Sequence, residues 1–166
     1  MDPAIETKPL TPADRGRLEA LCHACTEFFE LAMGQPGGIE TAAEILGPLP
    51  AKVTSGCKSI FGLERAGELI GVVELLAGFP SPSEWYVGLL LVRPESRSAG
   101  TGTLVWDDLR KKIAMEGGTA VRLIVQKQNP GARRFWERQG FAVEQEIVAK
   151  VGKLESQAWQ LHLSLR

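Results

Sequence analysis

The sequence predicts an α+β fold in which one mixed, mostly antiparallel sheet of about seven strands is flanked by about four helices. Three β-rich runs follow one another in the middle of the chain, with amphipathic helical segments on either side. A strand–helix–strand unit then spans residues 84–126, and such a crossover pairs its strands in parallel. The 166 residues, 44% of them hydrophobic, suit one ordinary domain, so we expect residues 1–166 to form a single domain.

After an opening strand, the first helical segment has Thr11 as its N-cap and Pro12 at its first position. An apolar stripe at helical spacing runs from there as far as Phe29. Residues 33–52 are rich in Gly and Pro around a short helical core at residues 41–46. These segments predict a helical cover over the sheet.

Three strands follow at residues 57–64, 68–76 and 84–92, and a turn at residues 65–67 joins the first two. From Gly100 the hydrophobic period becomes helical, and this helix ends at the glycine pair 117–118.

Residues 119–126 predict the next strand, and the helix after it has Asn129 as N-cap, Pro130 at its first position and Gly140 as its stop. Residues 141–151 and 157–165 predict the last two strands.

The charge balance and the cysteine count exclude several classes of protein. Nineteen Lys and Arg against twenty Asp and Glu leave a formal charge of -1, which provides no global field for holding nucleic acid. No apolar stretch approaches the roughly 18 residues of a membrane span. Three cysteines are too few for a disulfide scaffold and fit a reducing compartment. We therefore expect a cytoplasmic protein that binds neither nucleic acid nor a membrane.

Cys22 and Cys25 form a C-x-x-C pattern, which could indicate zinc or redox chemistry. The pattern lies on a predicted helix, with no second C-x-x-C or His pair to complete a tetrahedral site. We expect two buried or half-buried helix cysteines and no metal.

A glycine-rich turn at residues 97–103 joins the third strand of the central run to the next helix, a place that favours an anionic ligand. A Walker loop needs a lysine between Gly102 and Thr103, and none is present. A dinucleotide-binding turn needs a third Gly or Ala where Val105 stands. The sequence therefore predicts another kind of anion at this turn.

The R-x-x-G-x-G pattern from Arg97 to Gly102 resembles the acetyl-CoA-binding motif of the GNAT superfamily of N-acetyltransferases. A second motif, "VQKQNPGARRFWERQGF", is similar to a later segment of that family, in which an Asn precedes a helix that ends in an aromatic pair, Glu and Gly-Phe. The two motifs and the elements around them cover most of the chain from about Thr11 to Phe141. The resemblance implies a GNAT fold and an acetyl-CoA-dependent N-acetyltransferase.

The resemblance also implies how acetyl-CoA is held. Its diphosphate would lie on the backbone N–H groups of the turn, with Arg97, and Arg93 or Arg133, adding positive charge. In the family, the strand before the turn splays from the next strand and pairs with the pantetheine arm, and Gly88 would mark the bulge that opens this gap. The implied cofactor residues are Leu91, Val92, Arg97, Ser98, Ala99, Gly100, Thr101, Gly102, Thr103, Asn129, Arg133 and Trp136.

Acetyl transfer needs a neutral amine, a polarised thioester and a proton for the departing thiolate. The family often takes that proton from a tyrosine in the second motif, but Trp136 stands there, where it would pack on the pantetheine or in the core. Tyr86 is the only tyrosine in the chain and lies on the strand before the turn. Tyr86, Glu74 and Glu84 are therefore the candidate catalytic residues.

The resemblance assigns the choice of acceptor to the variable helical cover and loops. Phe28, Phe29 and Phe79 could form an apolar wall, and Glu27, Glu30 and Glu74 could attract a cationic amine. We expect the primary amine of a small molecule to attack the thioester directly in a ternary complex. The missing tyrosine keeps a second function open, a non-catalytic acyl-CoA-binding sensor or module. The β-rich tail could pair two copies at a sheet edge as a homodimer.

Overall fold

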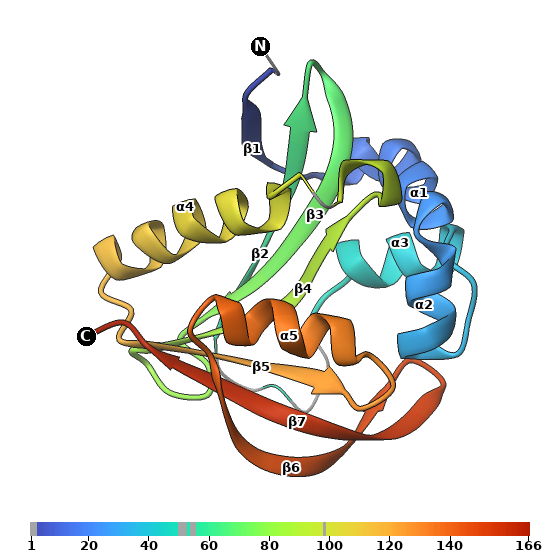
Figure 1. Cartoon of the computed structure of the whole chain (residues 1–166). Helices are drawn as coiled ribbons and strands as arrows, with labels where there is room; N and C mark the ends of the chain where they lie inside the picture. The colour runs from blue at the N-terminus through green and yellow to red at the C-terminus, as the bar shows by residue number, and fades with distance from the viewer. Residues whose placement is uncertain (1–2, 50–52, 54–55, 98) are drawn as a thin grey trace.

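The computed structural model describes residues 3–49, 53, 56–97 and 99–166, and its helices and strands follow the predicted order (Figure 1). The strands in this part of the chain are β1 Ile5–Pro9, β2 Cys57–Arg65, β3 Glu68–Ala77, β4 Glu84–Val92, β5 Ala120–Gln126, β6 Ala142–Val151 and β7 Leu154–Ser164. The α-helices are α1 Arg15–Ala24, α2 Thr26–Met33, α3 Ile39–Leu46, α4 Thr101–Met115 and α5 Pro130–Arg138. Short 3-10 turns at Pro12–Asp14 and Pro94–Ser96 precede α1 and the loop before α4.

The predicted first helix is two helices, so the described residues hold five α-helices where about four were expected. The break falls at Cys25, whose N–H still donates to the carbonyls of Leu21 and Cys22, while its own carbonyl accepts from Phe28 and begins α2. The apolar stripe continues across the break because both helices pack on the same face of the sheet. Periodicity alone therefore could not reveal the change of direction.

All seven described strands form one sheet in the order β1-β2-β3-β4-β5-β7-β6. The neighbours pair antiparallel except β4 and β5, which are parallel and joined through α4. The mixed, mostly antiparallel sheet is confirmed. β7 begins at Leu154, three residues earlier than predicted, because a tight turn with Gly152 at φ +58° lets β6 and β7 pair up to Val151 and Leu154.

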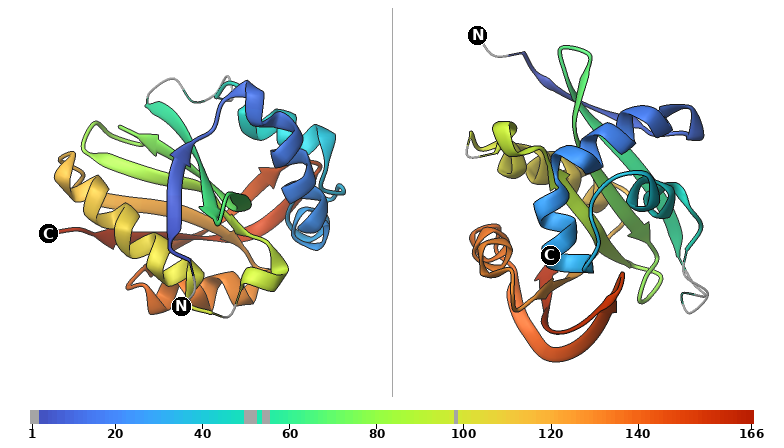
Figure 2. Two further views of the ribbon diagram at one scale, coloured as in Figure 1. Left: turned by 90° about the horizontal axis from the view of Figure 1, so that it is seen from above. Right: turned by 90° about the vertical axis from the view of Figure 1, so that its right-hand side faces the viewer.

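Helices cover both faces of the sheet, with α4 and α5 on one side and α1 to α3 on the other (Figures 1 and 2). Each side has its own apolar core. On the α4/α5 side, Trp106 is 1% exposed and packs with ring centroids 5.3 Å from both Trp136 and Phe141. On the other side, Leu18 and Phe29 pack against Val72 and Leu91 of the sheet. Among the described residues, none of the helices combines the length and apolar character needed to span a membrane.

β4 and β5 pair over only three residues, Glu84–Tyr86 with Ala120–Arg122, and then diverge (Figure 1). On its other side, β4 carries a bulge: Glu74 of β3 lies opposite Leu89, the next residue of β3 lies opposite Val87, and Gly88 is the extra residue. A Cβ on Gly88 would lie 2.6 Å from Oε1 of Glu74, so a larger residue at the bulge would push that carboxylate aside. The predicted bulge at Gly88 and the predicted divergence are confirmed.

The C-terminal end of α2 is held by the far end of the chain. The carbonyl oxygens of residues 31–33 accept hydrogen bonds from Gln128 Nε2 at 3.2 Å, Gln126 Nε2 at 3.2 Å and the Lys153 backbone N–H at 2.8 Å. These are the carbonyls that a helix leaves without internal partners. The bonds fix α2 beside the mouth of the gap between β4 and β5.

We expect Trp106→Ala to lower the free energy of unfolding by roughly 3–5 kcal/mol, because it opens a cavity beneath α4 at the centre of the aromatic cluster. Met115→Ala is the matched control, since Met115 lies on the same helix and is 88% exposed. Urea unfolding followed by circular dichroism measures both. Equal losses for the two variants would contradict this packing.

Candidate active site

The glycine-rich turn between β4 and α4 leaves backbone donors facing outward. Gly100 has φ +74°, a left-handed conformation that favours glycine, and α4 starts at the next residue. The first helical hydrogen bond runs from the Leu104 N–H to the Gly100 carbonyl, so the N–H groups of Thr101, Gly102 and Thr103 have no partner within α4. Together with the helix dipole, these donors make the start of α4 suited to binding an anion, and we call this place the anion seat.

Gly102 is favoured for a different reason, the close approach of α5. A Cβ at this position would lie 3.0 Å from the ring of Phe135. The absence of a side chain lets the start of α4 and the face of α5 line one continuous cavity.

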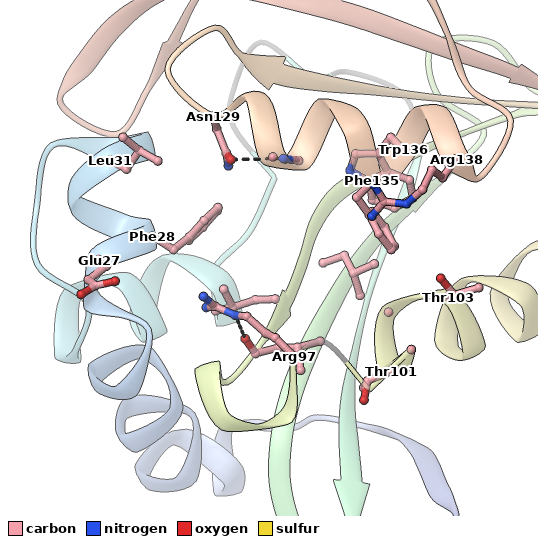
Figure 3. A pocket seen from close by; sticks show the side chains of 17 residues that line it. Glu27, Phe28, Leu31, Arg97, Thr101, Thr103, Asn129, Phe135, Trp136 and Arg138 are labelled. Carbon is pink, nitrogen blue, oxygen red and sulfur yellow. Dashed lines mark hydrogen bonds between the residues drawn. The ribbon is translucent and has the colours of Figure 1, made fainter.

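This cavity has a volume of about 650 Å³, within the usual range for a bound small ligand. Figure 3 shows side chains from α2, the β4–α4 loop, α4 and α5 around it. The lining residues are Glu27, Phe28, Leu31, Leu90, Leu91, Val92, Arg97, Gly100, Thr101, Gly102, Thr103, Asn129, Gly131, Ala132, Phe135, Trp136 and Arg138. We call it the loop-side cavity.

Most of the predicted cofactor residues lie together here: Leu91, Val92, Arg97, Gly100, Thr101, Gly102, Thr103, Asn129 and Trp136. Ala99 is exposed and does not line the cavity, and Ser98 lies outside the described residues. Asn129 serves first as the N-cap of α5, because its Oδ1 accepts from the Ala132 N–H at 3.2 Å. Arg97 Nε donates to the Val92 carbonyl at 2.7 Å, which brings its guanidinium back over the end of β4 (Figure 3).

The two alternative arginines point elsewhere. Arg133 stacks on the ring of Trp159, 4.4 Å from its centroid, and pairs with Glu137 at 2.9 Å. Arg93 pairs with Glu68 and with Glu95 and does not line the loop-side cavity. Both stay predictions that this conformation does not favour.

Arg138 lines the cavity instead and was missed from the sequence (Figure 3). Arg133, Arg134 and Arg138 all lie on α5, and the direction in which the helix presents each one depends on its packing against the sheet. Helical spacing sets Arg134 and Arg138 on one face, four residues apart, and Arg133 beside it. Which face of α5 is turned toward the loop-side cavity follows only from the packing of the helix on Trp159.

A second cavity of about 410 Å³ lies on the other side of the gap, between β4, β5, α2, α3 and the β6–β7 turn. Its polar lining residues are Thr41, Glu44, Glu74, Tyr86, Gln126, Asn129 and Lys150. Its apolar wall includes Phe28, Phe29, Met33, Ile45, Leu89 and Leu123. We call it the helix-side cavity.

The two cavities share Phe28, Leu90, Asn129, Ala132 and Trp136. They therefore meet where β4 has left β5. From Val87 to Val92, the edge of β4 that faces β5 has no strand partner among the described residues. A molecule lying along this edge would reach from the anion seat to the helix-side cavity.

Glu74 and Tyr86, two predicted catalytic residues, both line the helix-side cavity. Burial raises the pKa of Glu74 above its usual range, while Lys58, whose Nζ lies 3.4 Å from Oε2, opposes that rise. Burial, with Glu74 nearby, also raises the pKa of Tyr86, so its phenol keeps its proton at neutral pH. The ring of Tyr86 packs edge-on against Phe79, with centroids 5.6 Å apart.

Glu84, the third candidate, lies apart from both cavities. Its carboxylate pairs with Arg122, which also pairs with Glu144 at 3.0 Å. The hydrogen bond from Arg122 lowers the pKa of Glu84. Glu84 stays a prediction that this geometry does not favour.

Cys22 and Cys25 are free and buried, as expected. Burial raises the pKa of Cys22 to about 11, so its thiol is protonated and unreactive at neutral pH. Within the part of the chain that the structure describes, no cluster of His, Cys, Asp and Glu could hold a metal ion.

Comparison with known proteins identifies the class to which this architecture belongs. The model of the acetyltransferase (GNAT) family matches residues 24–141, and the chain belongs to this family. This match confirms the resemblance seen in the two motifs. No curated protein sequence matches the chain.

Solved structures of acetyltransferases share the fold. An acetyltransferase from Thermus thermophilus superposes with a TM-score of 0.78 at 21% identity, covering 99% of each chain. The ribosomal-protein-S18-alanine N-acetyltransferase from Escherichia coli gives 0.67 at 16% identity, covering 98% of this chain and 94% of its own. The PaiA N-acetyltransferase from Thermoplasma acidophilum, solved in complex with coenzyme A, gives 0.70 at 18% identity, covering 97% and 99%.

The family uses acetyl-CoA, and the loop-side cavity fits that molecule. The N–H groups at the start of α4, which have no partner within that helix, suit a diphosphate, and the apolar stretch from Leu90 to Val92 suits the pantetheine arm. When bound, acetyl-CoA supplies the activated acetyl group, while the chain binds the molecule and orients it.

We expect Gly102→Asp to weaken acetyl-CoA binding more than about 30-fold, because it places a side chain against Phe135 and a negative charge at the anion seat. Gly16→Asp is the matched control, since a Cβ on Gly16 meets nothing within 4 Å. Isothermal titration calorimetry measures both affinities. Unchanged binding in Gly102→Asp would place the diphosphate elsewhere.

Two arginines on α5 allow a test of the sequence prediction, which named Arg133, against the observed geometry, which favours Arg138. Arg138→Ala should weaken acetyl-CoA binding about tenfold, since Arg138 lines the loop-side cavity and would act on a phosphate group. Arg133→Ala should leave the affinity within about twofold, because its side chain stacks on Trp159. The reverse order of effects in the same titration would restore Arg133 as the cofactor residue.

Proposed function

We propose that the protein is an acetyl-CoA-dependent N-acetyltransferase that acetylates the primary amine of a small molecule by direct attack in a ternary complex. The observation that carries this proposal is the pair of cavities that share five lining residues in the gap between β4 and β5. Two separate cavities that meet at one point allow donor and acceptor to be bound together.

A small molecule suits the acceptor cavity. The helix-side cavity is walled by α2, α3 and the β6–β7 turn and has a volume of about 410 Å³. Its wall is largely apolar, with the carboxylates of Glu44 and Glu74 among its polar groups. This lining favours an amine attached to an apolar body, with the carboxylates attracting its positive charge.

Glu74 is the base in this proposal. The amine nitrogen attacks the thioester carbonyl carbon, a C–N bond forms, and the C–S bond then breaks to release the CoA thiolate. The proton lost from the nitrogen passes to the Glu74 carboxylate, directly or through water. Because this carboxylate lies over the Gly88 bulge, it faces the place where the strands diverge.

Tyr86 is the hydrogen-bond donor in this proposal. Its raised pKa keeps the phenol neutral, so it donates to the developing thiolate or orients the amine. Trp136 lines both cavities but cannot supply this proton, because an indole N–H is far too weak an acid. A backbone N–H on the free edge of β4 could polarise the thioester carbonyl.

The alternative function is a non-catalytic acyl-CoA-binding module. The observation that favours it is the tryptophan at the position where the family often has a tyrosine. Thiol release from acetyl-CoA with a panel of primary amines distinguishes the two functions. Turnover with an amine supports the enzyme, and tight CoA binding with no turnover on any amine supports the module.

The cytoplasmic location and the homodimer are two further predictions, and each has partial support. The free and buried cysteines agree with a cytoplasmic protein. β6 is one of the two edge strands of the sheet and has one side without a strand partner among the described residues, which supports the prediction of a homodimer paired at this edge.

We expect Tyr86→Phe to lower kcat by about 10- to 100-fold while the affinity for acetyl-CoA stays within about twofold, because the variant loses the phenolic proton and keeps the ring against Phe79. Steady-state kinetics with the acceptor found in the amine panel, and calorimetry with acetyl-CoA, provide the two readouts. Unchanged kcat would remove Tyr86 from the chemistry.

A further inference from the structure

Lys58 of β2 is a lysine with unusual surroundings. Its side chain is only 12% exposed, although lysines are mostly found at the surface. Its Nζ donates a hydrogen bond at 2.9 Å to the carbonyl of Gly47, the C-cap of α3, and lies 3.4 Å from Oε2 of Glu74. Lys58 therefore connects β2, β3 and the end of α3.

The contacts of Lys58 and Glu74 are specific to each other. Among the described residues, Glu74 is the one carboxylate within ion-pair distance of Lys58, and Lys58 is the one cation within that distance of Glu74. The strand neighbours directly opposite Glu74, Ile60 of β2 and Leu89 of β4, are apolar. Burial raises the pKa of a carboxylate in that setting, and a cation beside it opposes the rise.

The orientation of the Glu74 carboxylate is also defined by its contacts. Oε1 of Glu74 lies 2.6 Å from the position that a Cβ of Gly88 would take, whereas Oε2 faces Lys58. The lysine thus holds one oxygen while the other lies over the bulge. The Gly47 carbonyl holds the lysine in turn, which also places a positive charge at the C-terminal end of α3.

We propose that Lys58 is a positioning residue for catalysis: it aims the Glu74 carboxylate over the β4 bulge and supplies the positive charge that keeps this base ionised. The inference rests on the proposed function, in which Glu74 accepts the proton of the amine. It adds a residue that lines neither the loop-side nor the helix-side cavity.

The charge of Lys58 acts on the protonation of Glu74 in a definite direction. Burial raises the pKa of Glu74 and Lys58 lowers it, while the other groups that face the same cavity are the neutral phenol of Tyr86, the carboxylate of Glu44 and the amine of Lys150. Removing Lys58 therefore raises the pKa of Glu74, and a protonated Glu74 cannot accept a proton. The acidic limb of the pH profile of kcat/KM then moves to higher pH.

The experiment measures the protonation of Glu74 directly, without any acceptor. The 13Cδ resonance of Glu74 in glutamate-labelled protein is assigned by its loss in Glu74→Gln, and its titration gives the pKa. We expect Lys58→Met to raise this pKa by about one unit and Lys58→Arg to leave it within about 0.3 units. Lys58→Gln serves as a second neutral variant, and circular dichroism verifies that each variant is folded.

Lys127→Met is the matched control, because Lys127 also pairs with a glutamate, Glu146 at 2.9 Å, and lines neither cavity. It should leave the Glu74 resonance unchanged. An unchanged or lowered Glu74 pKa in folded Lys58→Met and Lys58→Gln would overturn the proposal.

The second readout is the pH profile of kcat/KM with an amine that the wild-type protein acetylates. A shift of its acidic limb equal to the shift of the Glu74 pKa, with rescue by Lys58→Arg, supports the proposal. A shifted pKa with an unmoved limb overturns the catalytic role of both residues, although acetyl transfer itself would stand. A chain that acetylates no amine would overturn the proposed function and this role together, and the resonance would still show whether the ion pair exists.

Discussion

The short pairing between β4 and β5 is the constraint on which the site depends. Parallel strands normally stay paired along their length, but these two separate after Tyr86 and Arg122. The extra residue Gly88 bends β4 on its β3 side, just after the last paired residue. The two cavities meet where β4 and β5 have separated. A residue larger than glycine at this bulge would push the Glu74 carboxylate aside.

The two cavities offer different groups to a ligand. The loop-side cavity relies on main-chain groups, the N–H donors at the start of α4 and the free edge of β4, together with an apolar wall. Recognition through the backbone suits a ligand that stays the same while the sequence varies, because most substitutions leave the main-chain groups in place. The helix-side cavity relies on side chains from several elements, and these can vary without disturbing the sheet.

How much the sequence revealed depends on how local each feature is. The predicted anion seat spans six neighbouring residues, and Gly100 has a direct conformational cause, so the pattern alone could predict it. The break at Cys25 and the inward direction of Arg138 depend on packing against distant strands, which periodicity does not encode. Glu84 is two residues from Tyr86 and shares its strand face, yet Arg122 on the neighbouring strand takes its carboxylate. Lys58 carried no signal, because its partner Glu74 is known only from strand register.

The attachment of α2 to residues near the far end of the chain bears on the order of assembly. The helix supplies one wall to both cavities, but its last carbonyls are satisfied by groups 94 and 97 residues later and by Lys153. On a ribosome that wall can be completed only after β5 and the final hairpin have been synthesised. An unfinished chain therefore has the start of α4 in its sequence well before it can complete the helix-side cavity, and the two cavities come together only after the β6–β7 turn has been synthesised.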